Sequence, residues 1–335
     1  MKKIFFLLIV PVVFMHGATA QSGYKLANTF HSASDGGWDY IFANSKSNKL
    51  YVSHAAQVNV LDKTTGDSLG IIPNTQGVHG IAAVNKLNKG YTSNGRANTV
   101  TVFDLSSEKI LNQIATGENP DAIFYDTYSK KIITCNGRSK DLSIIDPTTD
   151  KVVATIAVGG KPETAVSDNA GKIFVNIEDK NEIVAIDIKK NEVIAHWSLG
   201  GAEGPTGLAI DTDTKRLFAG CEEKLAVMDA TNGNIVTTIA IGAGCDGVAF
   251  DNSAKTIFTS NGGAATISVI KEASKDKFEL IENIPTKKGA RTICIDDATK
   301  ALYLPAADYE PQASGAQGRP KMVSGSFQIL VFKKK

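Results

Sequence analysis

The chain contains 335 residues, 42% of them hydrophobic and 21% charged, with 36 lysines and arginines against 35 aspartates and glutamates. This near balance argues against a broad phosphate-binding face, so we expect no broad nucleic-acid binding. The four cysteines lack the spacing of a zinc site, which gives no support to a structural zinc centre.

The N-terminal segment, residues 1–20, has the pattern of a signal peptide. Lys2 and Lys3 precede an apolar run, which ends before the small residues Ala18-Thr19-Ala20. We therefore expect cleavage before Gln21 and a periplasmic or secreted location. Without the two lysines the mature chain keeps 34 basic and 35 acidic residues, a formal charge of −1. No later apolar run is long enough to span a bilayer, so we expect no transmembrane segment in the mature chain.

Apolar alternating runs that close on an aspartate recur along the chain at a nearly constant spacing. The closing residues are 42, 42, 41 and 42 positions apart: Asp62, Asp104, Asp146, Asp187 and Asp229. A sixth run follows 42 positions later, with Lys271 in the turn position. Self-similarity at this period predicts an array of one supersecondary unit.

Each repeat has the pattern of a four-stranded antiparallel sheet. Between residues 119 and 159, four short runs are rich in β-branched and aromatic residues and are separated by turn residues. These runs are Asp121–Asp126, Lys131–Asn136, Asp141–Asp146 and Val152–Val158. The aspartate that closes the third run is expected to accept hydrogen bonds from the N–H groups of the following turn.

A second series, of apolar or aromatic pairs, marks the second strand of each repeat seven times. The pairs are 40 to 45 residues apart: Leu50-Tyr51, Gly90-Tyr91, Ile132-Ile133, Ile173-Phe174, Leu217-Phe218, Ile257-Phe258 and Leu302-Tyr303. We therefore predict an all-β fold over residues 21–335, a seven-bladed β-propeller of four-stranded antiparallel blades. The last blade ends with Gln328–Lys335 as its third strand, and Tyr24–Phe30 matches a fourth strand. We expect this N-terminal strand to complete the last blade and close the ring.

An insertion at residues 305–326 interrupts the last blade, where other blades have about five to ten residues. It connects the second and third strands, so it projects from the mouth at which second strands end. We expect a lid over the channel that carries Tyr309, Arg319 and Lys321, with a flexible surface loop as the alternative.

These repeats resemble the YVTN-repeat β-propeller family, of which the YncE-like periplasmic proteins are the familiar members. The resemblance covers essentially the whole mature chain. It is carried by Tyr51-Val-Ser-His54, Tyr91-Thr-Ser-Asn94, Phe174-Val-Asn-Ile177, Asn98-Thr-Val-Thr-Val-Phe-Asp104, Gly117-Glu-Asn-Pro-Asp121 and Gly160-Lys-Pro-Glu163. It implies a propeller and, from the family's periplasmic members, export, but no particular activity, because propellers host several classes of enzyme and pure binding modules.

The candidate site lies where first strands begin and second strands end, since both crowd the same mouth of the channel. The first-strand positions are Asp39, His79, Asp121, Glu163, Thr206, Asp246 and Arg291, and the second-strand ends are His54, Asn94, Asn136, Ile177, Cys221, Asn261 and Ala306. We predict ligand binding by the polar members: Asp39, His54, His79, Asn94, Asp121, Asn136, Glu163, Asp246, Asn261 and Arg291. Their charge varies from blade to blade, as an asymmetric ligand requires. For the asparagines, the alternative is that they satisfy turns.

Two histidines, His54 and His79, reach this mouth from adjacent blades. Beside Asp39 and Asp121 they would form a cluster suited to acid–base chemistry or to a divalent cation, the alternative being a solvated, hydrogen-bonded pair.

The four cysteines fall at strand positions. Cys135 and Cys294 are expected to be buried apolar residues. Cys221 and Cys245 share a rim in adjacent blades, and spacing alone leaves open whether they form a disulfide.

Two functions of different classes follow from these residues. In the first, the protein is an exported propeller that binds a small polar ligand, or an envelope or protein partner, at the channel mouth, with Arg291 as the positive group. In the second, it is a lactonase-like hydrolase or a lyase, whose catalytic candidates are His54, His79 and Asp121, assisted by a divalent cation or a proton on the carboxylates. We prefer binding, because the sequence has no nucleophile elbow, metal motif or dinucleotide fingerprint.

Overall fold

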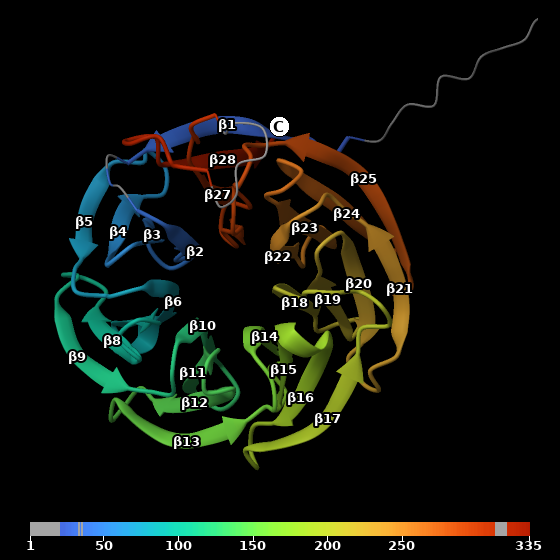
Figure 1. The fold of residues 1–335 in the computed structure, drawn as a ribbon, viewed down its shortest axis with the longest axis horizontal. Coiled ribbons are helices and arrows are strands. Elements are labelled where there is room, and N and C mark those ends of the chain that lie inside the picture. The colour runs from blue at the N-terminus through green and yellow to red at the C-terminus, as the bar shows by residue number, and fades with distance from the viewer. Residues whose placement is uncertain (1–20, 33, 35, 312–319) are drawn as a thin grey trace, which may run out of the picture.

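The chain folds into seven four-stranded antiparallel sheets arranged as blades around a central channel (Figure 1). The computed structural model describes residues 21–32, 34, 36–311 and 320–335. The predicted signal peptide, and Arg319 of the predicted lid, lie outside the described residues. The predicted seven-bladed propeller is confirmed.

Six blades take their strands from consecutive segments. In chain order they are β2 (Trp38–Ala43), β3 (Lys49–His54), β4 (Gln57–Asp62) and β5 (Ser68–Ile72); β6 (Val78–Val84), β7 (Lys89–Asn94), β8 (Thr99–Asp104) and β9 (Ile110–Ala115); β10 (Pro120–Asp126), β11 (Lys131–Asn136), β12 (Asp141–Asp146) and β13 (Lys151–Ala157); β14 (Pro162–Ser167), β15 (Lys172–Ile177), β16 (Glu182–Asp187) and β17 (Glu192–Ser198); β18 (Gly207–Asp211), β19 (Arg216–Gly220), β20 (Lys224–Asp229) and β21 (Ile235–Ala240); and β22 (Cys245–Asp251), β23 (Thr256–Asn261), β24 (Thr266–Ser274) and β25 (Lys277–Pro285). The seventh blade has the order β1 (Tyr24–His31), β28 (Gln328–Lys334), β27 (Leu302–Ala306) and β26 (Cys294–Ile295).

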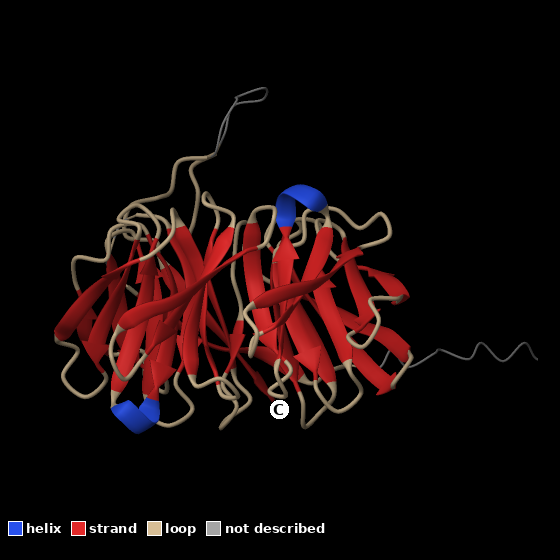
Figure 2. Cartoon of the chain, turned by 90° about the horizontal axis from the view of Figure 1, so that it is seen from below, coloured by secondary structure: helices blue, strands red, loops and turns tan. Residues whose placement is uncertain are grey.

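Two short 3-10 turns, η1 (Asn85–Leu87) and η2 (Glu178–Lys180), lie on opposite faces of the ring (Figure 2). No helix in the described part of the chain has the length and hydropathy needed to cross a membrane.

The aspartates at the third-strand ends act as the sequence predicts. Asp62 Oδ1 accepts the backbone N–H groups of Thr64 at 2.8 Å and Thr65 at 2.9 Å. Asp146 Oδ1 accepts the N–H of Thr148 at 2.8 Å. The regular part of the repeat is therefore turn chemistry at the third-strand ends that carry an aspartate.

The hydrophobic core lies between neighbouring blades. Ile133 and Ile144 of the third blade, for example, belong to one buried cluster with Ile173 and Val184 of the fourth. Because each sheet is covered on both faces by its neighbours, its second and third strands are almost wholly buried. The polar starts of the innermost strands are left to face the channel.

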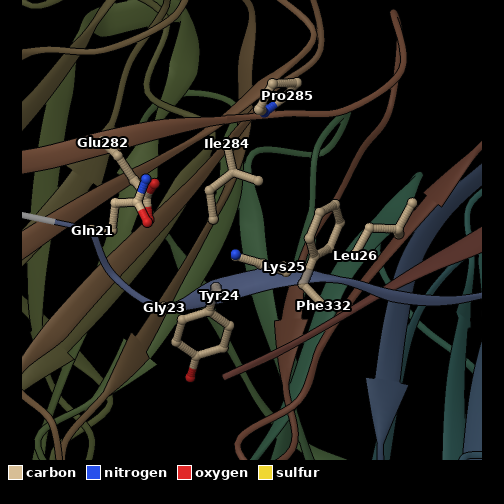
Figure 3. A pocket seen from close by; sticks show the side chains of 9 residues that line it. All are labelled: Gln21, Gly23, Tyr24, Lys25, Leu26, Glu282, Ile284, Pro285 and Phe332. Atoms are coloured by element: carbon tan, nitrogen blue, oxygen red, sulfur yellow. The ribbon is translucent and has the colours of Figure 1, made fainter. Parts of the chain in front are cut away.

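Strand β1 closes the ring, as predicted. It pairs antiparallel with β28 from Tyr24↔Lys334 to His31↔Gln328, so the first and last segments of the propeller share one sheet. Ser22 N–H also donates to Glu282 Oε1 of β25 at 2.8 Å. Figure 3 shows the groove of about 300 Å³ along this seam, between Lys25 and Leu26 on β1 and Ile284 on β25.

Candidate functional site

A β-bulge at the start of the innermost strand recurs in five blades. The strand register shifts at Trp38/Ile41, Val78/Ile81, Pro120/Ile123, Pro162/Ala165 and Cys245/Gly247. Each shift includes one of the predicted site residues: Asp39, His79, Asp121, Glu163 and Asp246. A bulge changes the direction of side chains at a strand end, so the local backbone presents these five groups at the channel.

The serines of the repeat motif hold two of these bulges. Ser53 Oγ accepts the N–H of Asp39 at 3.0 Å, and Ser93 Oγ accepts the N–H of Gly80 at 2.8 Å. Both serines are fully buried on second strands. The motif therefore supplies acceptors to backbone groups that the bulge removes from the strand ladder.

Three of the predicted residues converge in a single cluster, which we call the His79 cluster: Asp39, His79 and Asp121. Asp39 Oδ2 lies 2.6 Å from His79 Nδ1, and Asp121 Oδ1 lies 3.8 Å from the same nitrogen. One ligand atom from each of the three residues lies within 4.8 Å of the other two. Three of the four residues of the predicted carboxylate and imidazole cluster are thus brought together, from the first three blades, and the fourth, His54, is not among them.

The orientation of His79 depends on Gly95, which follows the second strand of the same blade. A Cβ at position 95 would lie 2.7 Å from His79 Nε2 and 2.8 Å from Asn119 Oδ1. The absence of a side chain there leaves room for the imidazole. Its Nε2 side lies against Gly95, while Nδ1 is directed to the two carboxylates.

The channel holds more carboxyl groups than basic groups to balance them. Burial raises the pKa of both Asp121 and Glu163, and the neighbouring carboxylates, Asp39 for the first and Asp121 for the second, raise it further. Burial opposes the charged form of His79, but its bond to Asp39 and the Asp121 carboxylate raise its pKa to about 9. Lys161 pairs with Glu163 at 2.5 Å. At neutral pH the imidazole is therefore a cation within an acidic ring.

Tyr40 is a site residue that the sequence argument missed. Its hydroxyl lies 3.2 Å from Thr164 Oγ1, so the side chain extends across the channel from the first blade to the fourth. Burial raises its pKa well above the usual value, and the carboxylates of Asp121, Asp39 and Glu163 add to this effect. The only sequence signal was its position directly after Asp39, within the bulge.

A cavity of about 720 Å³ opens at the channel mouth, and we call it the mouth cavity. Trp38, Tyr309 and Met322 supply large side chains to its wall, and Asp246 and Arg291 supply charge. Several glycines complete the wall and leave space: Gly36, Gly37, Gly244, Gly262, Gly263 and Gly289.

Arg291 is already engaged within the protein. Its Nη1 lies 3.0 Å from Asp246 Oδ2, and its Nη2 donates to Trp38 O at 3.3 Å. Trp38 Nε1 in turn donates to Arg291 O at 2.7 Å. The predicted positive group is therefore present at the mouth but is neutralised by a carboxylate.

Four predicted residues lie apart from the His79 cluster. The ring of His54 packs on Phe327 with centroids 4.3 Å apart, and this histidine is 1% exposed. The amides of Asn94, Asn136 and Asn261 are buried within their own blades and donate to third-strand side chains. Their acceptors at 2.6 to 2.9 Å are Thr101, Asp141, Ser143 and Ser268. These contacts match the alternative reading of the asparagines as residues that hold strand ends.

The cysteines are all free thiols in the structure. Cys135 is buried, as expected, and Cys221 and Cys245 are buried as well. Cys294, which was also expected to be buried, is only partly buried. Burial raises the pKa of Cys221 and Cys245 to about 12, which makes both thiols poor nucleophiles. The disulfide left open by the sequence is not formed.

The described parts of the 305–326 insertion cover one side of the mouth cavity. Tyr309 pairs with Met322 in an isolated antiparallel bridge, and both residues line the cavity together with Pro320. The two described segments of the insertion, residues 305–311 and 320–326, rise from one face of the ring (Figure 2). Lys321 is exposed and pairs with Glu310 at 3.0 Å instead of facing the channel.

Comparisons with known proteins support the architecture. No protein-family model matches the chain, and no curated protein sequence does. Among solved structures, a chain of "Kuenenia stuttgartiensis Hydrazine Synthase" superposes with a TM-score of 0.70 at 15% sequence identity. The match covers 79% of this chain and 91% of that chain. At such low identity, what this chain shares with that structure is a β-propeller fold.

Proposed function

We propose that this protein is an exported β-propeller that binds a small polar ligand in the mouth cavity. The observation that carries the proposal is the cavity itself, whose volume of about 720 Å³ falls within the range typical of small-molecule sites. Its wall combines the aromatic side chains of Trp38 and Tyr309 with a few convergent polar groups, as such sites usually do. The signal-like N-terminal pattern and the resemblance to YncE-like proteins support export.

The cavity wall carries charges of both signs. Asp246 and Glu222 contribute carboxylates, Lys288 and Arg291 contribute basic groups, and Thr206 contributes a hydroxyl. Because Arg291 is paired with Asp246, a free anion would have to compete with that carboxylate. We therefore place uncharged polyhydroxy compounds and zwitterions such as amino acids ahead of simple carboxylates.

A second function, hydrolysis or lyase chemistry, is favoured by one observation, the pairing of His79 with Asp39 at 2.6 Å. A carboxylate that orients an imidazole is a common element of acid–base sites. Here the raised pKa keeps the imidazole protonated at neutral pH, so it suits a general acid better than a base. No serine, threonine or cysteine among the described residues hydrogen-bonds to His79, so a covalent side-chain nucleophile activated by this histidine has no support.

The binding proposal is tested by filling the cavity. Gly37 lines it, and a Cβ at this position would have no atom within 4 Å, so Gly37→Leu adds bulk to the cavity without a clash at Cβ. Gly37→Ala is the matched control, because it changes the backbone in the same way and fills little space. Melting temperatures would be recorded with millimolar amines, amino acids, sugars, hydroxy acids and lactones.

We expect a compound that raises the melting temperature of the wild type and of Gly37→Ala but not of Gly37→Leu. Equal shifts in all three proteins would show that binding occurs elsewhere. Turnover of a lactone or ester that disappears in His79→Ala and Asp121→Ala, with the melting temperature retained, would favour the enzymatic function instead.

A further inference from the structure

We infer that Asp39, His79 and Asp121 form a site for one divalent transition-metal ion, of the Zn²⁺ or Mn²⁺ class, at the junction of the first three blades. The inference is separate from the small-ligand proposal, because these three residues are not part of the wall of the mouth cavity. It rests on the geometry of the three side chains and on the surroundings of Asp121.

The donor atoms are spaced as ligands of one ion would be. With metal–ligand bonds of about 2.1 Å, two ligands of a tetrahedral ion lie about 3.4 Å apart, and neighbouring ligands of an octahedral ion about 3.0 Å. The separations from His79 Nδ1 are 2.6 Å to Asp39 Oδ2 and 3.8 Å to Asp121 Oδ1, which bracket these values. The ligand atoms of Asp39 and Asp121 lie within 4.8 Å of each other. Rotation of these two side chains toward each other would bring all three atoms to bonding distance.

The carboxylate of Asp121 supplies the independent observation. Asp121 is 8% exposed, and its Oδ1 is buried without a hydrogen-bond partner among the described residues. A carboxylate oxygen removed from water without a donor is costly, so such groups are ordinarily paired or bound to a metal. This oxygen is directed into the cluster, toward His79 Nδ1.

The imidazole of His79 is oriented so that its Nδ1 atom can bind the ion. Its Nε2 side lies against Gly95, where even a methyl group would come within 2.7 Å. Nδ1 is therefore the nitrogen that would bind the ion, which would displace the proton that Nδ1 now directs to Asp39 and release it to solvent. Asp39 and Asp121 would then bind from the two flanking blades.

The donor set selects the class of metal. One imidazole nitrogen with two carboxylate oxygens suits zinc, manganese or iron, whereas calcium and magnesium prefer all-oxygen shells with more ligands. Three protein ligands leave at least one coordination position for water or a bound molecule. The site would thus place a Lewis acid in the channel, where Asp39 follows Trp38 of the mouth cavity wall directly in the chain.

The test uses tag-free protein treated with a chelator, because a polyhistidine tag would itself bind zinc. Calorimetric titrations with Zn²⁺, Mn²⁺, Mg²⁺ and Ca²⁺ would be compared for the wild type, Asp121→Asn and Glu182→Gln. Glu182 is the matched control, because it also pairs with a histidine, 2.9 Å from His196 Nδ1, at the outermost strand of a blade.

We expect one equivalent of Zn²⁺ or Mn²⁺ to bind the wild type and Glu182→Gln, with Mg²⁺ and Ca²⁺ much weaker. Asp121→Asn should weaken binding by roughly 100-fold or more, since loss of even an outer-shell partner costs 10–100-fold. Without metal, Asp121→Asn should unfold at a urea concentration close to that of the wild type, because asparagine has nearly the same shape as aspartate and Oδ1 of Asp121 accepts no hydrogen bond that would be lost.

Three results would overturn the inference. The wild type could bind no ion at 100 micromolar, Asp121→Asn could bind Zn²⁺ or Mn²⁺ with roughly the affinity of the wild type, or Glu182→Gln could lose as much affinity as Asp121→Asn. A metal-free Asp121→Asn protein that is clearly less stable, with no metal effect in the wild type, would show that the carboxylate has only a structural role.

Discussion

Tyr24 and Phe30 on strand β1 are predicted to hold the propeller ring closed. Tyr24 is 6% exposed, its ring meets Phe258 edge-on at 5.0 Å, and its hydroxyl donates to Lys300 O at 3.0 Å. Phe30 is 3% exposed at the other end of the strand. Truncating a buried aromatic residue to alanine costs about 3–5 kcal/mol, and losing one hydrogen bond about 1 kcal/mol. We therefore expect losses of about 3–5 kcal/mol for Tyr24→Ala or Phe30→Ala and about 1 kcal/mol for Tyr24→Phe.

Leu26→Ala is the control within the same strand. Leu26 is 53% exposed, so its truncation should change stability by less than about 0.5 kcal/mol. The free energy of unfolding would be measured by urea denaturation followed by circular dichroism. If Tyr24→Ala and Phe30→Ala were no more destabilising than Leu26→Ala, β1 would not be the strand that closes the ring.

Two further predictions concern the site and the pH dependence. Gly95→Ala should displace the His79 ring and weaken Zn²⁺ binding in calorimetry. Gly137→Ala is the control at the equivalent position of the next blade, where the nearest atom to the added Cβ is 3.2 Å away, and it should leave the affinity unchanged. Equal affinities in the two variants would contradict the role of Gly95. Burial raises the pKa of Glu272 to about 7. The neighbouring Asp211 raises this pKa further, while the hydrogen bond from Thr214 lowers it. The folded state therefore holds this proton more tightly than the unfolded chain does. Protonated Glu272 contributes its full stabilisation to the free energy of unfolding below the unfolded pKa of about 4.5, and this stabilisation is lost as pH rises through 7. Urea denaturation at pH 5 and pH 8 should therefore show a smaller stability difference for Glu272→Gln than for the wild type, and an unchanged difference would refute the assignment.

Much of the fold could be predicted because each repeat solves the same local problem. The run from Asp141 to Asp146 matches β12 at both ends, and its closing aspartate accepts turn N–H groups as expected. The N-terminal strand could be placed because an unpaired sheet edge at β28 needs a partner. These features depend on neighbouring residues and a fixed period, which a sequence displays directly.

The site could be predicted only in part. Counting along the repeat found Asp39, His79 and Asp121, since the bulge occurs at the same place in their blades. Contacts across the ring are not periodic, so the packing of His54 on Phe327 could not be predicted from the repeat. The same holds for Tyr40, which meets a residue 124 positions away.

The most direct test of a functional channel mouth is a crystal structure of tag-free protein isolated from the compartment in which it accumulates, with anomalous diffraction recorded at the zinc edge. We predict density for a small molecule between Trp38 and Tyr309, and an anomalous peak among Asp39, His79 and Asp121. Ligand density in the groove between β1 and β25, with neither feature in the channel, would contradict the account.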